Sequence, residues 1–267
     1  MPEYLIVMTA SIQPAAGAQI ARKDPKIRLQ DYKAALRFWL AERHPKLHRI
    51  LFLENSGSDL SELQAIARDE NSLGKEVEFI SMQRNQIPAG VNYGYGEMQM
   101  LDEGLKRSSL RQRTTHMVKV TGRLTFPGIA RLMDKLPESF DACVECRIPT
   151  HSYKTANLWK VLKTHAGAYT TAQMMIFSHA FYEKELQKLY FLLQPEFPDS
   201  YPTLIENIIF DRLIQFEGQP GIYLRWPIEM EPAGQAGHRN KRYDDPKRAI
   251  VRAVRSAART LAPRLWI

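Results

Sequence analysis

The stretch RILFLENSGSD, residues 49–59, is an apolar run that ends abruptly in a carboxylate, an amide and a polar turn. A run of β-forming residues closed by Ser, Gly and Asp is typical of a buried strand at the point where it leaves the core. Asp59 and Ser61 are good capping residues, so the segment SELQAIARDE that follows is expected to be a helix. One strand-to-helix step is therefore predicted here.

The same alternation extends along the chain in both directions. Strands are expected at YLIVMTA (4–10), VEFISM (77–82) and HMVKVTGRL (116–124), and helices at about 30–43 and in EMQMLDEGLKRS (97–108). Strands and helices that alternate at this spacing predict an α/β fold with a mostly parallel central sheet and helices on both faces.

The second half of the chain is less regular. Strands are expected in FDACVECRI (140–148) and PGIYLRWPIEM (220–230), and helices at about 178–193 and within YPTLIENIIFDRLIQF (201–216). Because we find no internal repeat and no low-complexity linker, residues 1–245 are expected to form a single domain. A basic amphipathic C-terminal helix is expected at 246–267.

The net charge, the apolar runs and the cysteine count indicate the kinds of partner and the compartment to expect. The chain has 267 residues and a formal net charge of +8, and much of the basic excess lies after Asp245. This charge favours partners that carry phosphate. No apolar run reaches the roughly 18 residues of a membrane span, and the N-terminus reads as a core strand rather than a signal peptide. Two cysteines form no disulfide framework, so a reducing cytoplasm is expected.

Polar residues follow the first two strands. Ligands bind at the carboxyl ends of strands in sheets of this kind, so Thr9, Ser11, Glu54 and Asn55 are candidate binding residues. The alternative for 55–59 is a tight turn and helix cap without a ligand.

Three motifs together resemble a known family. ENSGSD (54–59), GYGEMQMLDEGL (94–105) and KVTGRL (119–124) occur in an order that resembles bacterial glycosyltransferases with a GT-A-like nucleotide-binding fold. The likeness is to polysaccharide-assembly enzymes with a Lys-x-Thr-Gly-Arg element, and it covers roughly residues 3–230 in layout.

The resemblance implies a donor site. Thr9, Ser11, Glu54 and Asn55 would line the pocket for the nucleotide of a sugar nucleotide. The glycine-rich stretch GVNYGYGE, which contains Gly94 and Gly96, would lie beside that pocket and offer backbone N–H groups to an anion.

The chain departs from most families of this fold because it contains no Asp-x-Asp pair for a divalent metal. A diphosphate leaving group needs its charge neutralised by a metal or by fixed cations. Lys119 and Arg123 have the required charge, and Gly122 would let the backbone approach a phosphate. We therefore expect transfer without a metal or other cofactor. The alternative is that Lys119 and Arg123 are ordinary strand-end charges.

The catalytic base is expected on the helix within 201–216. An inverting transfer needs a carboxylate that deprotonates the acceptor hydroxyl, and Glu206 stands near the start of this mostly apolar helix. Asp211 and Asp141 are alternative bases. A capping or ion-paired role for Glu206 is equally compatible with the sequence.

Two basic segments have open roles. The loop EPAGQAGHRNKRY (231–243) is expected to close over a pyrophosphate with His238, Arg239 and Lys241, or else to be a plain surface loop. The C-terminal helix, with its terminal Leu265–Ile267 tip, resembles an interfacial membrane anchor. Its alternative is a helix packed on the domain with solvated arginines outside.

The pair Cys143 and Cys146 lacks a second pair for zinc, so two buried thiols on a strand are expected.

These observations predict a cytoplasmic glycosyltransferase, peripheral at the inner face of the membrane if the C-terminal helix is an anchor. It would use a nucleotide-sugar donor to extend a bacterial surface glycan, such as lipopolysaccharide or capsule, on a glycan or lipid-linked acceptor.

One alternative is a sugar-1-phosphate nucleotidyltransferase, although TASIQPAAGAQIARKD (9–24) is not the compact basic glycine loop such enzymes need. The other is a non-enzymatic, basic nucleic-acid-binding protein, although the aromatic residues are not interleaved with the basic cluster.

Overall fold

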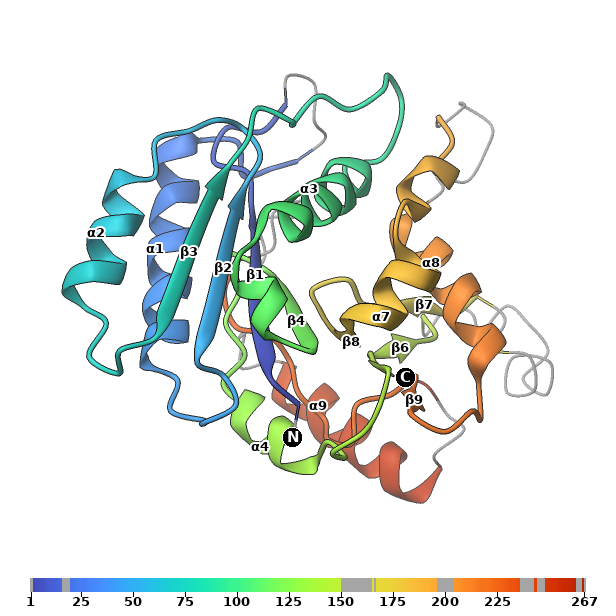
Figure 1. Cartoon of the computed structure of the whole chain (residues 1–267). Helices are drawn as coiled ribbons and strands as arrows, with labels where there is room; N and C mark the ends of the chain where they lie inside the picture. Colours follow the sequence, from blue (N-terminus) through green and yellow to red (C-terminus); the bar gives the residue numbers. More distant parts are fainter. Residues whose placement is uncertain are drawn as a thin grey trace.

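The computed structural model describes residues 2–15, 20–149, 165, 167–195, 204–235, 243, 248–262 and 266. Its centre is a sheet of seven strands in the order β3-β2-β1-β4-β8-β5-β9 (Figure 1). The strands are β1 (Tyr4–Ala10), β2 (Arg49–Glu54), β3 (Glu76–Ser81), β4 (His116–Thr121), β5 (Ala142–Cys143), β8 (Met174–Ser178) and β9 (Ile222–Tyr223). The first four are parallel to one another, and β8 runs antiparallel between β4 and β5. The predicted α/β class with a mostly parallel sheet is confirmed.

Helices cover both faces of this sheet. The helices α1 (Pro25–Ala41), α2 (Ser61–Asp69) and α4 (Ile129–Lys135) pack on one face, and α3 (Gly94–Arg107) and α8 (Ile205–Leu213) pack on the other. Alternate residues of a strand point to opposite faces, and β1 is apolar on both. Ile6 and Met8 join the cluster under α1, while Leu5 and Val7 join the cluster under α3.

Helix α1 begins earlier than the apolar spacing predicted. It starts at Pro25, and the Asp24 side chain accepts hydrogen bonds from the backbone N–H groups of Lys26 (2.8 Å) and Ile27 (3.4 Å). An N-cap Asp followed by Pro is a strong start signal. The first turn carries little of the apolar stripe, so periodicity alone missed it.

The helix predicted at 178–193 is wrong as one continuous element. The structure has α7 (His179–Phe181), a π-helical turn (Tyr182–Leu186) and a 3₁₀ turn (Leu189–Leu192). Buried Asp102 of α3 accepts hydrogen bonds from the Tyr182 hydroxyl (2.6 Å) and from the Lys188 N–H (2.9 Å). Lys188 is left-handed, with φ of 65°, so the helix ends at this tertiary contact.

The strand predicted at 140–148 is divided between two sheets. Within it, β5 belongs to the central sheet, whereas β6 (Cys146–Arg147) pairs with β7 (Tyr169–Thr170). The break falls at Glu145, whose carboxylate accepts a hydrogen bond from the Trp226 N–H at 3.1 Å. The strand predicted at 220–230 is reduced to β9. The backbone N–H of Trp226 is used by the Glu145 carboxylate, so it is not available to a neighbouring strand. Cys143 and Cys146 are buried thiols as expected.

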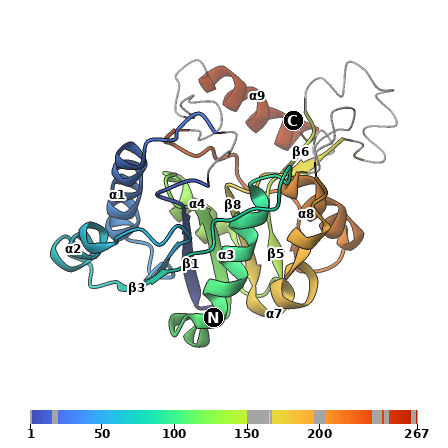
Figure 2. The ribbon, with the colours of Figure 1, turned by 90° about the horizontal axis from the view of Figure 1, so that it is seen from above.

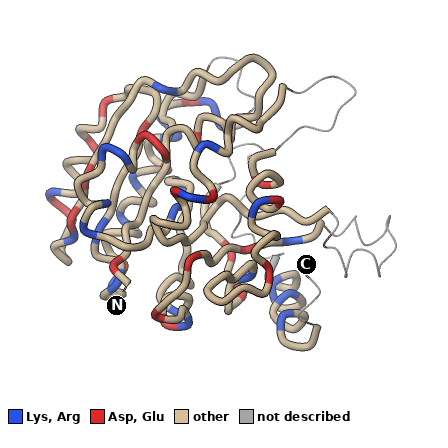
Figure 3. The backbone as a smooth tube through the Cα atoms, turned by 45° about the vertical axis from the view of Figure 1, so that its right-hand side comes forward, with Lys and Arg blue, Asp and Glu red and all other residues tan. Residues whose placement is uncertain are grey.

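The C-terminal helix α9 (Arg248–Leu261) carries several basic residues (Figure 3), and two of its arginines, Arg255 and Arg259, pair with glutamates of the domain. Arg259 lies 2.5 Å from Glu229 and 2.6 Å from Glu145, and Arg255 pairs with Glu231. The predicted alternative of solvated outer arginines is therefore reversed. Seen from above, α9 lies at the edge of the molecule opposite α7 (Figure 2).

The outer side of α9 is apolar. Ile250 is 75% exposed, Val254 is 54% exposed and Leu261 is 84% exposed. Of the expected apolar tip, Leu265 and Ile267 lie outside the described residues, whereas Trp266 is buried and stacks on His165 with a ring distance of 3.8 Å. In the part of the chain that the structure describes, no helix is long and apolar enough to cross a membrane.

The buried His179 predicts a pH dependence of stability. Burial, with smaller contributions from Arg111 and His116, lowers the pKa of His179 to about 4. Between about pH 6.5 and pH 4 the histidine is protonated in the unfolded chain but stays neutral in the folded chain. The free energy of unfolding therefore falls as the pH drops through this range. We expect this residue to contribute up to about 3 kcal/mol of that loss.

Urea denaturation between pH 4 and pH 7.5 gives the free energy of unfolding of wild type and of His179→Gln at each pH. The contribution of His179 is the difference between the slopes of these two free energies against pH. His48, which is exposed, provides the matched control as His48→Gln. Parallel curves for wild type and His179→Gln would contradict the assignment.

Candidate active site

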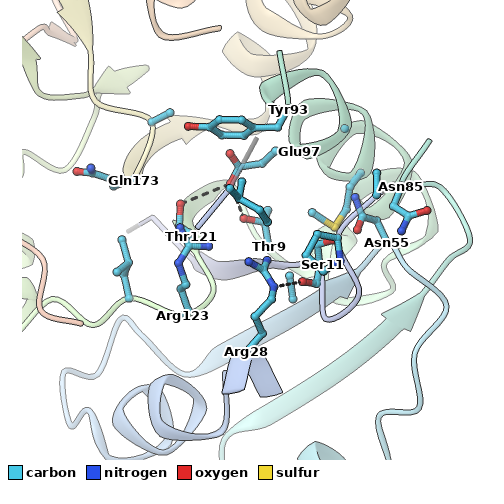
Figure 4. Close-up of a pocket in the computed structure, with 18 of the residues that line it drawn as sticks. Thr9, Ser11, Arg28, Asn55, Asn85, Tyr93, Glu97, Thr121, Arg123 and Gln173 are labelled. Carbon is cyan, nitrogen blue, oxygen red and sulfur yellow. Dashed lines mark hydrogen bonds between the residues drawn. The ribbon is translucent and has the colours of Figure 1, made fainter. Parts of the chain in front are cut away.

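A cleft opens at the carboxyl ends of β1, β2 and β4, between the starts of α3 and α8 (Figure 4). It encloses about 1020 Å³ of empty space, part of it open to solvent. This is the location that the strand-end argument predicts, because loops leave the sheet there and expose polar groups. The predicted residues that line it are Thr9, Ser11, Asn55, Gly96, Arg123 and Glu206.

Other predicted residues lie elsewhere. The predicted residues that do not line this cleft are Glu54, Gly94, Lys119 and Gly122. His238, Arg239 and Lys241 lie outside the described residues, so their predicted lid role stays a prediction.

Glu54 is fully buried and holds the loops together. Its carboxylate accepts hydrogen bonds from the backbone N–H groups of Ile12 (3.0 Å), Ser56 (3.0 Å) and Ser58 (3.1 Å). Asp59 similarly accepts from the Ser61 N–H at 2.9 Å. Both oxygens of Glu54 are thus used by backbone N–H groups, so Glu54 holds the turn that follows it instead of lining the cleft.

Asn55, the next residue, points into the cleft. It is 5% exposed, and its Oδ1 finds no hydrogen-bond partner within the described part of the chain. An unsatisfied buried acceptor costs about 1–3 kcal/mol, a cost that a donor on a bound ligand would remove. Asn85 lies beside it in Figure 4. Together they form a polar end of the cleft.

Lys119 does not reach the cleft surface. It is fully buried on β4, and its Nζ donates to Glu97 Oε1 at 2.7 Å and to the Ala172 carbonyl at 2.5 Å. The predicted direct contact with a diphosphate does not fit this position. The pleat of β4 points the Lys119 side chain toward α3, where it forms an ion pair with Glu97 in the first turn of that helix.

Glu97 occupies the floor of the cleft and was not among the predicted site residues. Its Oε1 accepts from Thr9 Oγ1 (2.7 Å), Thr121 Oγ1 (3.5 Å) and Lys119. Burial raises the pKa of Glu97, but the charge of Lys119 and these hydrogen bonds outweigh that effect. The net result is a lowered pKa. Glu97 is therefore ionised at neutral pH. The sequence motif GYGE contains Glu97. A glutamate at the start of a helix is also expected simply because it stabilises the helix dipole, so the motif alone did not mark it as a site residue.

Glu206, in the first turn of α8, also lines the cleft. Burial raises the pKa of its carboxyl, and the negative charge of Glu97 adds to the rise. A carboxylate with a raised pKa is a stronger base at neutral pH. The two alternative bases lie outside the cleft: Asp211 is exposed, and Asp141 accepts from Ser178 Oγ at 2.8 Å.

Two arginines supply positive charge. Arg123 lines the cleft and donates from Nε to the Gln235 carbonyl at 3.1 Å. Arg28 of α1 donates from Nε to the Ser11 carbonyl (2.6 Å) and from Nη2 to the Tyr32 hydroxyl (2.9 Å). Figure 4 shows both side chains reaching toward the floor of the cleft. Arg28 was missed because a single arginine within a helix gives no sequence signal.

Comparison with known proteins gives only distant likenesses. No protein-family model matches the chain, and no curated protein matches it. Among solved structures, the apo bifunctional glycosyltransferase WbbM aligns over 84% of this chain and 38% of its own, with 14% identity and a TM-score of 0.47.

Two further structures represent the two enzyme classes expected from the sequence. The galactosyltransferase LgtC, in complex with donor and acceptor sugar analogues, covers 77% of this chain and 69% of its own at 12% identity and a TM-score of 0.43. A putative glucose-1-phosphate thymidylyltransferase from Bacillus anthracis covers 89% and 91% at 11% identity and a TM-score of 0.42. Likenesses with TM-scores below 0.5 assign no activity to this chain.

Among the described residues, no group of three or more His, Cys, Asp or Glu side chains is placed to hold a metal ion.

Three glycines near the cleft differ in what they allow. A Cβ on Gly122 would lie 2.7 Å from the Thr9 carbonyl oxygen, and one on Gly94 would lie 2.5 Å from Ile205. Gly122 is thus required by the neighbouring strand rather than by a phosphate, and Gly94 by the contact of α3 with α8. A Cβ on Gly96 would make only ordinary contacts, at 3.6 Å from Ile87 and 3.7 Å from Asn55.

We therefore expect Gly122→Ala to lower the free energy of unfolding by about 1–3 kcal/mol, because backbone must move. Gly96→Ala should keep wild-type stability, because its methyl group makes only ordinary contacts. Chemical denaturation of the two variants tests this pair. Equal stability of both would contradict the packing argument.

Proposed function

We propose that this protein is a glycosyltransferase that moves a sugar from a nucleotide-sugar donor to a hydroxyl of a glycan. One observation carries the proposal: a single cleft presents an unsatisfied amide, two guanidinium groups and two carboxylates. These groups match, in turn, the base, the diphosphate and the sugar hydroxyls of a sugar nucleotide.

In the proposed reaction, the oxygen of the acceptor hydroxyl attacks the anomeric carbon of the donor sugar. Glu206 takes the proton from that hydroxyl as the new bond forms. The bond between that carbon and the diphosphate oxygen breaks, and the nucleoside diphosphate leaves with the electron pair. Arg123 and Arg28 stabilise the charge that develops on the leaving group. Asn55 hydrogen-bonds the nucleobase and so fixes the donor in register.

We also propose that no divalent metal is needed. The support is that Arg28 and Arg123 both line the cleft, where positive charge stabilises a phosphate, although Arg28 also donates from Nε, Nη1 and Nη2 to protein acceptors.

Thermal stabilisation by nucleotides tests the donor site. UDP, GDP, CDP, CMP, dTDP and ADP are each added with EDTA or with manganese. We expect one nucleotide to stabilise the protein selectively in EDTA, by about 2.7 kcal/mol at a hundred times its Kd. The shift should shrink in Asn55→Ala. Stabilisation only with manganese would overturn metal independence, and no stabilisation by any nucleotide would overturn the proposed function.

The matching nucleotide sugars then separate the two enzyme classes. A glycosyltransferase releases nucleoside diphosphate from the sugar nucleotide. A sugar-1-phosphate nucleotidyltransferase instead releases pyrophosphate from a nucleoside triphosphate, and that product would reject glycosyl transfer.

We further propose that the acceptor is a lipid-linked surface glycan and that α9 binds an anionic bilayer at the inner face of the membrane. The support is the outward apolar side of α9, at Ile250, Val254 and Leu261. Co-sedimentation with vesicles of anionic and neutral lipid should show binding that Val254→Asp reduces at least tenfold. Leu73→Asp, at an exposed leucine after α2, is the control. Equal binding by both variants would exclude α9 as the contact.

A further inference from the structure

The Lys119–Glu97 pair is an unusual feature for a strand core. A fully buried lysine on a central strand is costly, and replacing a buried ion pair by apolar residues is often neutral or stabilising. The fold nevertheless carries this pair directly beneath the cleft, where Glu97 is 21% exposed while Lys119 is completely covered. The exposed partner is therefore the one that faces a ligand.

Within the described ranges of the chain, hydrogen bonds to Glu97 reach one of its two carboxylate oxygens. Thr9, Thr121 and Lys119 all donate to Oε1, and within the described part of the chain no hydrogen bond reaches Oε2. Figure 4 shows the Glu97 carboxylate between Thr9 and the ring of Tyr93. Oε2 is thus a fixed, ionised acceptor at the cleft, held in place by three donors on its partner oxygen.

The charge of Glu97 restricts what can bind beside it. A phosphate placed against an ionised carboxylate is repelled, whereas a neutral hydroxyl forms a short, charge-assisted hydrogen bond. The unsatisfied Asn55 amide marks a second polar point in the same cleft. In Figure 4, Asn55 and Asn85 lie at one side, Arg123 and Gln173 at the other, and Glu97 between them. A donor with its base at Asn55 and its diphosphate against Arg28 places its sugar beside Glu97, on the Arg123 side of the cleft.

We propose that Glu97 binds a hydroxyl of the transferred sugar through Oε2 and thereby selects the donor sugar. Lys119 and Thr9 position the carboxylate, and the ring of Tyr93 covers it. This inference rests on the proposed function, because it requires a nucleotide-sugar donor.

Glu97→Gln tests the inference by comparing two ligands. Titration calorimetry measures the affinity of a nucleoside diphosphate and of its nucleotide sugar for the wild type and the variant. The variant keeps an oxygen for Thr9 and Lys119 but loses the charge. We expect its affinity for the nucleotide sugar to fall about tenfold, which is the scale of one charge-assisted hydrogen bond. Its affinity for the nucleoside diphosphate should be unchanged or higher.

Mono-deoxy donors identify the hydroxyl and guard against a general loss of structure. The wild type should bind one deoxy donor about tenfold more weakly than the parent donor. The Glu97→Gln variant should bind that deoxy donor and the parent donor with equal affinity. Thr9→Val, which removes one donor to Oε1, should show a smaller loss for the nucleotide sugar and none for the nucleotide.

Different results would overturn the proposed function and the role of Glu97. If wild type binds neither ligand, the proposed function fails. If the nucleotide sugar binds but Glu97→Gln weakens both ligands equally, or neither, the role of Glu97 is overturned. The role is also overturned if every deoxy donor loses the same factor in wild type and variant.

Discussion

Replacing Glu206 by glutamine should lower kcat by a factor of about 10²–10⁴ while leaving the affinity for the nucleotide almost unchanged. The amide keeps the shape of the side chain but accepts no proton from the acceptor hydroxyl. Asp211→Asn is the matched control on the same helix, because Asp211 is exposed and lies outside the cleft. Steady-state kinetics on both variants, with nucleotide binding measured separately, decides between the two carboxylates.

The pH profile gives a second readout for Glu206. Because burial and the charge of Glu97 raise its pKa, the active, deprotonated form is lost at a higher pH than for an ordinary carboxylate. Activity should therefore fall as the pH drops through this raised value, and the acid limb should be absent from the residual activity of Glu206→Gln. A variant with wild-type kcat, or with the same acid limb, would exclude Glu206 as the base.

Lys119→Met should lower the free energy of unfolding by about 3–5 kcal/mol. The substitution fits the apolar strand but removes the charged donor from the Glu97 carboxylate and from the Ala172 carbonyl. Glu97 keeps its hydroxyl donors Thr9 and Thr121, but it must stay charged without the lysine or take up a proton. Urea denaturation measures the loss, with Lys106→Met, at an exposed lysine of α3, as the control.

The double variant Lys119→Met/Glu97→Gln separates lost packing from an unpaired charge. If the charge dominates, the double variant should regain at least half of the stability lost by Lys119→Met. If it is no more stable than the single variant, the loss comes from the lysine chain itself and the pairing energy is small.

The sequence predicted the first four strands well because each is an apolar run closed by turn residues. It failed where a tertiary contact decides the outcome. The helix at 178–193 is interrupted by Asp102, which lies more than 70 residues earlier in the chain. The strand at 140–148 is broken at the buried Glu145, which pairs with the distant Arg225 and Arg259 as well as with nearby Arg147. Periodicity carries no information about such distant partners.

The candidate site was predicted in location but not in every residue. Glu54 and Asn55 are neighbours at a strand end, and successive side chains there point in opposite directions. Spacing alone could not tell which one turns to the loops and which to the cleft. Lys119 was assigned to a ligand, whereas the packing of α3 gives it to Glu97. The role of each residue thus depended on the helix above the sheet.

The docking of Trp266 bears on how shortened versions of this protein should be designed. Its ring lies in the main core with His165 and Phe210, and its carbonyl accepts from the Ile148 N–H at 2.5 Å. Deleting everything from 248 onward would therefore remove a core tryptophan together with α9, at a cost on the order of 3–5 kcal/mol. A truncated chain that fails to bind a surface would report lost folding, whereas point substitutions on the outer side of α9 leave Trp266 in place.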